Sequence, residues 1–494
     1  MLAWTIYISF AGVLVLMLLP KGNAEAARKV ALLTAVAGFL CALSGFFEIN
    51  PGKLRTVTDV DWIPTLGIRY HLEADGVSLT LVLLTGLAAV AGILFSWNIE
   101  HRAKEFFAFY LALIGGVYGV FLSFDLFLLF VFYEIAIIPK YFIIAIWGST
   151  RREYGAMKLA LYSFVGSAMV LVGLIAAYVV SGAHTFSIIE LAKAGTFSHG
   201  FQMWAFPLVF VGFGILAGLW PFHTWAPTGH VAAPTAASML LAGVVMKLGA
   251  YGCLRVAMTL FPEGMLAWKM WIAVLAVIGI VYGALVALVQ KDFKFVIGYS
   301  SVSHMGFVIL GLATLNTIGL QGAVLQMFSH GVIAGLLFAV VGRMVYDRTH
   351  TRELATLEGM SLAKAMPFAA VTFVIAGCAS MGLPGFSGFV AELQVIIGTW
   401  RAFPTLAVLT GVGVLIGVAY TLRAMQKAFF GEAKPETETE HHLMESISVA
   451  ERLGAMLLIG AALVIGIFPK LLMDVIGPSF DSPLFDWLRK GGGQ

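Results

Sequence analysis

Seven ionisable side chains within apolar stretches are the residues most able to do chemistry. They are Glu134 and Lys140 in FLLFVFYEIAIIPKYFIIAIWG, His223 in GLWPFHTWAP, Lys247 in SMLLAGVVMKLGAYG, His304 in SSVSHMGF, His330 in QMFSHGV and Glu392 in FSGFVAELQ. A carboxylate, an amine and an imidazole can each hold or release a proton, and a neighbouring charge changes that tendency. Such groups inside a membrane are costly and are typical of proton relays. We therefore interpret the seven as candidate relay residues.

Each of these residues also has an ordinary structural interpretation. The two histidines His304 and His330 could bond across helices as neutral polar groups. The two glutamates could belong to buried structural ion pairs. Lys247 lies near the middle of its apolar segment, where its ammonium cannot easily reach the interface. Because five of these groups fall near the middle of five different segments, they predict a polar row within the membrane plane.

The composition indicates the elements that must position this row. The 494-residue chain is 60% hydrophobic and 12% charged, with a mean hydropathy of +0.93. Apolar segments of about 20 residues, the length of a membrane-spanning helix, recur with short connections from end to end. We expect an all-α polytopic protein with one membrane domain. A net charge of +3 does not suggest nucleic acid, and Cys41, Cys253 and Cys378 lack the spacing of a disulfide framework or metal site.

Counting apolar windows predicts fourteen spans. They cover 2–20, 29–48, 75–97, 106–123, 125–147, 155–181, 203–226, 232–259, 269–290, 293–315, 319–346, 366–400, 404–429 and 449–474. This divides the chain into N-terminal spans (1–105), a first five-helix unit (106–259), a second (269–430), a solvated cytoplasmic loop (431–448), and a last span with its tail (449–494).

The basic residues give the orientation. Lysine and arginine concentrate in alternate connections, those after odd-numbered spans, as the positive-inside rule requires of cytoplasmic loops. They include Lys21, Arg28, Lys29, Arg102, Lys104, Arg151, Arg152, Lys158, Lys291, Lys294, Arg343, Arg348, Arg352, Lys364, Lys427, Lys434 and Arg452. Both termini are therefore predicted to be non-cytoplasmic, and topology accounts for the lysines of QKDFK.

Two spans contain internal breaks, GLWPFHTWAP (218–227) and MGLPGFSGF (381–389). Proline and glycine breaks survive in lipid only where protein or a wet cavity satisfies the freed backbone groups. Breaks at matching positions in two halves point to inverted repeats around a translocation site, here spans 4–8 and 9–13. The alternative is a pair of structural kinks. His223 and His230 flank the first break and either line a proton route or cap freed backbone.

Several motifs are absent from the sequence. There is no Walker A sequence, no GxGxxG and no CxxC set. The sequence therefore contains no recognisable motif for binding a nucleotide, a flavin or an iron–sulfur cluster. If the chain belongs to a redox machine, we expect the electrons to travel elsewhere.

At these residues the sequence resembles the antiporter-like subunits of respiratory complex I, specifically subunit M of bacterial proton-translocating NADH:quinone oxidoreductase. The strongest stretches are FYEIAIIPKYFIIAIWG, PFHTWAPTGHVAAPTAASMLLAGVVMKLGAYGCLR, DFKFVIGYSSVSHMGFVILG and QMFSHGVIAGLLF. The resemblance implies a fourteen-helix fold, no cofactor in this chain, and proton pumping driven by quinone chemistry elsewhere. It places Glu134, Lys247, His304, His330 and Glu392 at the family's relay positions.

Two positions depart from the family pattern. The span 7 lysine that normally accompanies the span 5 glutamate is Leu216 here, and an aspartate two residues before His230 is Thr228. Lys140 stands where the family usually has an uncharged residue. It is six residues from Glu134, about 240° around an ideal helix and about 9 Å along it. Our hypothesis is that Lys140 replaces the missing lysine; the alternative is that it reaches to a membrane interface.

We expect a proton-translocating membrane-arm subunit of a complex-I-like enzyme in the bacterial inner membrane. Its expected partners are other membrane-arm subunits, especially homologous antiporter-like ones, with NAD, flavin, iron–sulfur clusters and quinone held by partner subunits. Three alternatives stay open: a multisubunit cation/proton antiporter, a hydrogenase-type membrane complex, and a scaffold whose relay is broken at Leu216.

Overall fold

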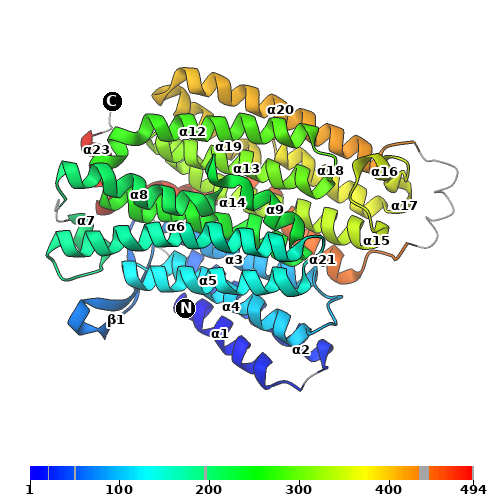
Figure 1. Cartoon of the computed structure of the whole chain (residues 1–494), viewed down its shortest axis with the longest axis horizontal. Helices are drawn as coiled ribbons and strands as arrows, with labels where there is room; N and C mark the ends of the chain where they lie inside the picture. Colours follow the sequence, from blue (N-terminus) through cyan, green and yellow to red (C-terminus); the bar gives the residue numbers. More distant parts are fainter. Residues whose placement is uncertain (21, 49–51, 194–196, 433–443, 492–494) are drawn as a thin grey trace.

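In the computed structural model, long helices lie side by side with their axes roughly parallel (Figure 1). The structure describes residues 1–20, 22–48, 52–193, 197–432 and 444–491. α1 and α2 form one edge of the array and α20 the opposite edge (Figure 1). Most of the predicted loop at 431–448 lies outside the described residues.

The helices of the N-terminal part and the first unit are α1 (Ala3–Leu18), α2 (Ala24–Phe47), α3 (Gly76–Leu94), α4 (Ala103–Leu122), α5 (Leu126–Trp147), α6 (Arg152–Ser181), α7 (Ile188–Lys193), α8 (His199–Ala217), η2 (Phe222–Thr224), α9 (Trp225–Ala232), α10 (Thr235–Leu240), η3 (Leu241–Val245), α11 (Met246–Gly252) and η4 (Cys253–Met258). From α10 to η4 the chain is helical throughout.

The second unit and the tail contain α12 (Pro262–Val289), α13 (Phe293–Ala313), α14 (Thr317–Ala339), η5 (Val340–Tyr346), α15 (Asp347–Thr349), α16 (Leu354–Glu358), α17 (Leu362–Ala365), α18 (Pro367–Ser380), α19 (Ser387–Ala402), α20 (Pro404–Phe429), α21 (Val449–Ile467), α22 (Lys470–Ser479), η7 (Pro483–Phe485) and α23 (Asp486–Gly491).

The all-α polytopic fold is confirmed, and each of the fourteen predicted ranges overlaps one or more helices. Among the described residues, 12 helices are long and apolar enough to cross a membrane. The first predicted span is the shorter α1, and the twelfth is divided into α18 and α19. The last predicted span was too long, because Pro469 cannot continue the hydrogen bonding of α21 and the tail restarts as α22.

Both predicted breaks are present. α8 ends at Ala217, and Gly218 takes a left-handed conformation before the chain re-forms helix through η2 and α9. α18 ends at Ser380, and two glycines with positive φ, Gly382 and Gly385, lead into α19. Glycine adopts this conformation without steric cost, so each chain can turn within its span. The inverted-repeat relation between the two units stays a prediction.

A β-hairpin between α2 and α3 was missed by the helix-based prediction. Strands β1 (Arg55–Ile63) and β2 (Ile68–Ala74) pair antiparallel around a short 3₁₀ turn, η1 (Pro64–Leu66). A search for apolar runs of membrane length overlooks this segment, because polar and apolar residues alternate in TVTDVDW. Asp125 joins the hairpin to α5: its carboxylate accepts from the backbone N–H of Arg69, Phe127 and Leu128.

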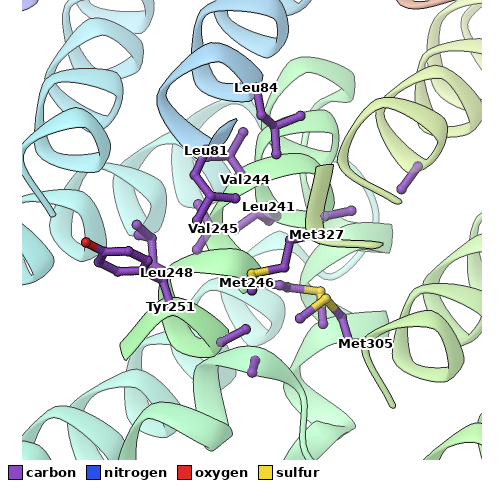
Figure 2. Close-up of a cluster of buried hydrophobic side chains, with 14 of the residues drawn as sticks. Leu81, Leu84, Leu241, Val244, Val245, Met246, Leu248, Tyr251, Met305 and Met327 are labelled. Atoms are coloured by element: carbon purple, nitrogen blue, oxygen red, sulfur yellow. The ribbon is translucent and has the colours of Figure 1, made fainter. Parts of the chain in front are cut away.

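Burial is most complete in α3, in the helical stretch from α10 to η4, and in α14. A stretch of 18 residues is entirely buried in each of three segments: Gly76–Leu94, Thr235–Met258, and Thr317–Thr349, which we call the α14 segment. Figure 2 shows Leu81 and Leu84 of α3 above the η3 valines, with Met246, Met305 and Met327 converging below them. Lys247 lies in this same segment and is fully buried. Its neighbours in the packed core therefore determine what its ammonium can contact.

Candidate functional site

Lys247 lies two residues after Val245, the last residue of the π-helical segment η3. Single π-helical turns widen the backbone and are frequent at functional sites. The Lys247 ammonium donates to the carbonyl of Ala242, five residues earlier, and its Nζ lies 2.8 Å from Nδ1 of His330 on α14. The lysine thus connects the end of the first unit to the second unit without contact with solvent.

The two histidines continue the line from Lys247. The rings of His330 and His304 stack with centroids 5.4 Å apart and planes 30° from parallel. Nδ1 of His304 lies 3.0 Å from Oε1 of Glu392 on α19, and its Nε2 lies 3.1 Å from Oγ of Ser380. All of these ionisable residues are less than a tenth exposed.

Four predicted relay residues therefore form one continuous row, Lys247–His330–His304–Glu392, across α11, α14, α13 and α19. Each group comes from a different helix, so the row runs across the helices rather than along one of them. We call this set the central row.

Gln326 contacts the central row but was missed from the sequence. Its Nε2 lies 3.4 Å from both Nδ1 of His304 and Oε1 of Glu392. It stands one helical turn before His330 on α14, at the i,i+4 spacing that places two side chains on one face. An amide four residues from a candidate histidine was the signal that could have identified it.

The other three predicted residues do not contact the central row. Glu134 is partly buried in α5, and one of its carboxylate oxygens has no hydrogen-bond partner among the described residues. The Lys140 side chain is fully buried, its Nζ has no such partner, and Glu134 is the charged group that acts on it. Since lipid-facing side chains are exposed in this structure, Lys140 does not extend its ammonium toward lipid.

His223 lies in η2, beside the break in span 7. It is buried, and its ring packs edge-on against Tyr282 at 5.3 Å between centroids. Neither ring nitrogen hydrogen bonds within the described part of the protein. Thr228, at the position where the family usually has aspartate, lies 3.3 Å from the Nζ of Lys158. The structure thus separates His223 from the central row and leaves its ring nitrogens free for other partners.

Two buried cations were not assigned a role in the sequence analysis. Lys294, attributed there to topology, is buried, and its Nζ donates to the carbonyl of Ala233 at 3.0 Å. Arg255 is fully buried two turns after Lys247 and forms a 2.6 Å ion pair with Asp75 at the start of α3. Arg255 could have been noticed because it is a charged residue inside a predicted span. Hydropathy alone does not show that its partner is Asp75.

The chemistry available to the central row is proton transfer. It combines an amine, two imidazoles and a carboxylate, each of which exchanges protons without any other bond breaking. Within the described residues, no group of three or more His, Cys, Asp or Glu side chains is arranged to hold a metal ion.

Comparison with known proteins places this geometry in a family. The profile described as NADH:quinone oxidoreductase/Mrp antiporter, TM matches residues 123–417. NADH-quinone oxidoreductase subunit M of Rhodobacter capsulatus is 38% identical over 490 residues, covering 96% of this chain and 94% of that protein. A chain of respiratory complex I from Thermus thermophilus superposes with a TM-score of 0.89 at 29% identity, over the whole of both chains.

The fold and the matching family profile define an antiporter-like membrane subunit. Within that class, the chain belongs to the family of NADH:quinone oxidoreductase subunit M, the membrane subunits of complex I. A chain of the Mrp complex from Dietzia also matches, with a TM-score of 0.86 and 20% identity over 99% of each chain. At that identity the likeness concerns the fold alone.

Proposed function

We infer that this chain translocates protons in a complex-I-like NADH:quinone oxidoreductase and carries no redox centre itself. The observation that carries the proposal is the central row, four proton-exchanging groups in contact across four helices and shielded from solvent. Burying such groups has a large free-energy cost and is retained where a membrane protein uses them. The identity to subunit M supports the redox complex as its setting.

The contacts define a sequence of transfers. The Lys247 ammonium gives its proton to Nδ1 of His330, whose Nε2 has no hydrogen-bond partner among the described residues and can release one. His304 takes a proton at Nε2, beside the Ser380 hydroxyl, and passes one from Nδ1 to the Glu392 carboxylate. The gap between the stacked rings requires a ring rotation or a water molecule to carry the proton. Each transfer moves the positive charge by one residue. A change in protonation at either end therefore alters the electrostatic field at the other members of the row.

We propose that Lys140 serves Glu134 as its cation in the first unit. Opposite charges in a largely apolar environment influence each other even when they are not hydrogen bonded, since the effective dielectric is lower than in water. Leu216, at the position where the family normally has this lysine, is buried and apolar. His223 completes the candidate proton-carrying groups of this unit. Losing or gaining a proton in the pair alters the field that reaches the central row.

The electron carriers belong to partner subunits in this proposal. NAD, flavin, iron–sulfur clusters and quinone are expected there, because the sequence contains no motif for them. The direct partners are other antiporter-like membrane-arm subunits, in the bacterial inner membrane with both termini non-cytoplasmic. A multisubunit cation/proton antiporter is the second candidate, favoured by the shared fold of the Mrp chain.

The test is Lys247→Ala in the intact complex, reconstituted into vesicles. We expect the number of protons pumped per NADH oxidised to fall, because the central row loses its amine. Lys53→Ala is the control, since Lys53 is exposed in the loop before the hairpin. Unchanged pumping would support a scaffold. Identifying the subunits that co-purify separates the remaining alternatives: flavin and iron–sulfur subunits support the redox complex, and only small membrane proteins support the antiporter.

A further inference from the structure

The connection that follows the α14 segment folds back onto the start of α13, on the face of the molecule expected to be cytoplasmic. Its Glu353 pairs with Asp292 in an antiparallel bridge, and the backbone N–H of Phe293 donates to the carbonyl of Arg352 at 2.8 Å. This pairing fixes the backbone of Arg352 beside α13. Topology accounts for a basic residue in this connection but not for the position of its guanidinium.

The Arg352 guanidinium contacts three segments at once. Its Nε lies 3.2 Å from Oδ2 of Asp292, the N-cap residue of α13. Its Nη1 donates to the carbonyl of Val231 in the last turn of α9 at 3.1 Å, and its Nη2 donates to Oγ1 of Thr150, between α5 and α6, at 3.3 Å. The side chain is only 9% exposed. These contacts use the planar fork of donors that distinguishes arginine from lysine.

The end of α9 is held by donors from the same segments. The backbone N–H of Ser149 donates to the carbonyl of Ala232 at 2.8 Å, and Nζ of Lys294, in the first turn of α13, donates to the carbonyl of Ala233 at 3.0 Å. The last carbonyls of a helix lack partners within the helix, so outside donors stabilise them. A cavity of about 180 Å³, whose lining includes Ser149, Ala233 and Lys294, lies beside these contacts and leaves room for the junction to shift.

The segments that meet at Arg352 lead to candidate proton-carrying groups in both units. α5 carries Glu134 and Lys140, α13 carries His304, and the chain after α9 continues into α11, which carries Lys247. Rigid helices and hydrogen-bond networks are the means by which a displacement at one site reaches another. One guanidinium therefore joins the end of the helix that carries the Glu134–Lys140 pair to two segments that position the central row.

We propose that Arg352 is a positioning residue that couples the Glu134–Lys140 pair to the central row. The inference rests on the proposed function. When the pair gains or loses a proton, the force on α5 changes, and the displacement of its end passes through the guanidinium to α13 and to the end of α9. The positions of His304 and Lys247 in the central row change with it. Arg352 itself takes up and releases no proton, because a guanidinium stays protonated in proteins.

The first test separates the fork of Arg352 from its charge. Arg352→Gln in the reconstituted complex is expected to lower both the protons pumped per NADH and the unfolding temperature. Arg352→Lys keeps a charge opposite Asp292 but cannot serve three segments at once, so we expect it to recover the unfolding temperature and not the proton yield. Arg151→Gln is the matched control, since Arg151 is exposed and belongs to the connection that Arg352 contacts. Recovery of both quantities by lysine would make Arg352 an ion-pair partner only, and the inference would be wrong.

The second test measures the coupling itself. Glu134→Gln is expected to lower the proton yield of the otherwise unchanged complex and to add no loss in the Arg352→Gln complex, where the link is already cut. Lys247→Ala should lower the yield further in that same complex, because the central row remains intact there. If Glu134→Gln lowers the yield by the same factor in both backgrounds, the two sites are independent and the link is overturned. If Lys247→Ala impairs pumping and Arg352→Gln does not, the inference is also wrong, and the proposed function stands.

Discussion

At the scale of single residues, Lys140 departs from the family pattern that the sequence resemblance implies. α5 continues through Pro139 without interruption, and the side chain of the next residue is buried with no hydrogen-bond partner in the described structure. Burying an unpaired polar group costs about 1–3 kcal/mol. We therefore interpret Lys140, buried at that cost on the same helix as Glu134, as a residue that serves function rather than stability.

Lys140→Met is expected to lower pumping and to raise the thermal stability of the purified complex, because it removes an unpaired buried amine. The double variant Lys140→Met/Leu216→Lys should recover pumping, since it returns a lysine to the family position. Leu216→Lys alone is the control for the second substitution. Proton yield per NADH and the unfolding temperature in detergent are the measurements. Full pumping by Lys140→Met would contradict the hypothesis that Lys140 replaces the lysine missing at position 216.

At the scale of elements, a pair of glycines determines how closely η3 approaches α14. A Cβ built on Gly331 would lie 2.6 Å from the carbonyl oxygen of Gly243 and 2.6 Å from Cδ1 of Leu84. The two backbones therefore meet with no room for a side chain. Gly331 follows His330, so this close approach sets the distance between His330 and Lys247.

Gly331→Ala should force η3 and α14 apart and weaken the 2.8 Å contact between Lys247 and His330. We expect lower pumping together with a lower unfolding temperature. Gly335→Ala, one turn along the same helix, is the control: its Cβ would first meet Cδ1 of Leu458 at 3.8 Å, an ordinary van der Waals distance. The packing argument fails if both alanine variants behave alike.

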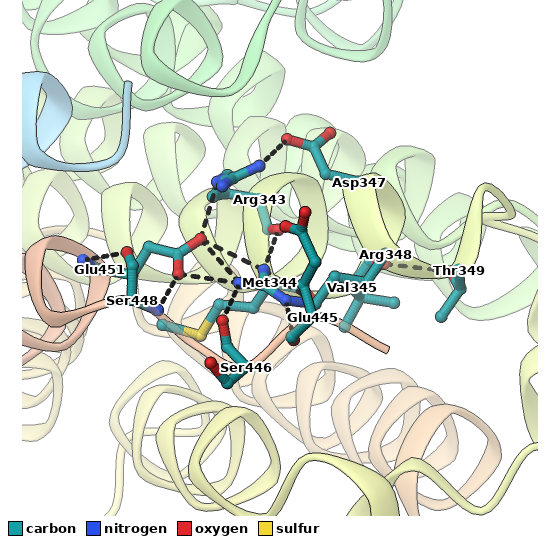
Figure 3. A network of polar contacts seen from close by, with 10 residues as sticks. All are labelled: Arg343, Met344, Val345, Asp347, Arg348, Thr349, Glu445, Ser446, Ser448 and Glu451. Atoms are coloured by element: carbon teal, nitrogen blue, oxygen red, sulfur yellow. Dashed lines mark hydrogen bonds and ion pairs between the residues drawn. The ribbon is translucent and has the colours of Figure 1, made fainter. Parts of the chain in front are cut away.

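At the scale of the whole molecule, a buried charge network joins the last long helix to the second unit. Figure 3 shows Arg343 and Arg348, from the end of the α14 segment, converging on Glu451 at the start of α21. The guanidinium groups lie 2.7 Å and 2.9 Å from its carboxylate oxygens, and Ser448 completes the cap of α21. The Glu451 and Arg348 side chains are almost completely buried. The network holds α21 against the helix that carries His330.

Glu451→Ala leaves two arginines without their shared acid. Removing one partner of a buried ion pair costs about 3–5 kcal/mol. We expect a lower unfolding temperature and less of the subunit retained in the purified complex. Glu445→Ala is the matched control, because only the backbone carbonyl of Glu445 contacts Arg348. Equal stability of the two variants would show that the network does not hold α21.

The sequence by itself determined the membrane fold, the positions of both broken spans and the identities of the groups in the central row. These properties follow from apolar segment length, from proline and glycine, and from the cost of burying a charge, all of which can be read along the chain. It missed the β-hairpin, because alternation over a few residues is a weaker signal than twenty apolar ones.

Only the tertiary structure decided which of these groups are neighbours. Lys247 contacts a histidine 83 residues away, while Glu134, Lys140 and His223 stay apart from the row. The same packing buries Lys294 beside a cavity and leaves both ring nitrogens of His230 without a hydrogen-bond partner among the described residues. Depth within a span is a property of one helix, but contact depends on how helices are rotated and how closely they approach. Those are set by side-chain packing, such as the meeting of Gly243 and Gly331, between segments distant in sequence.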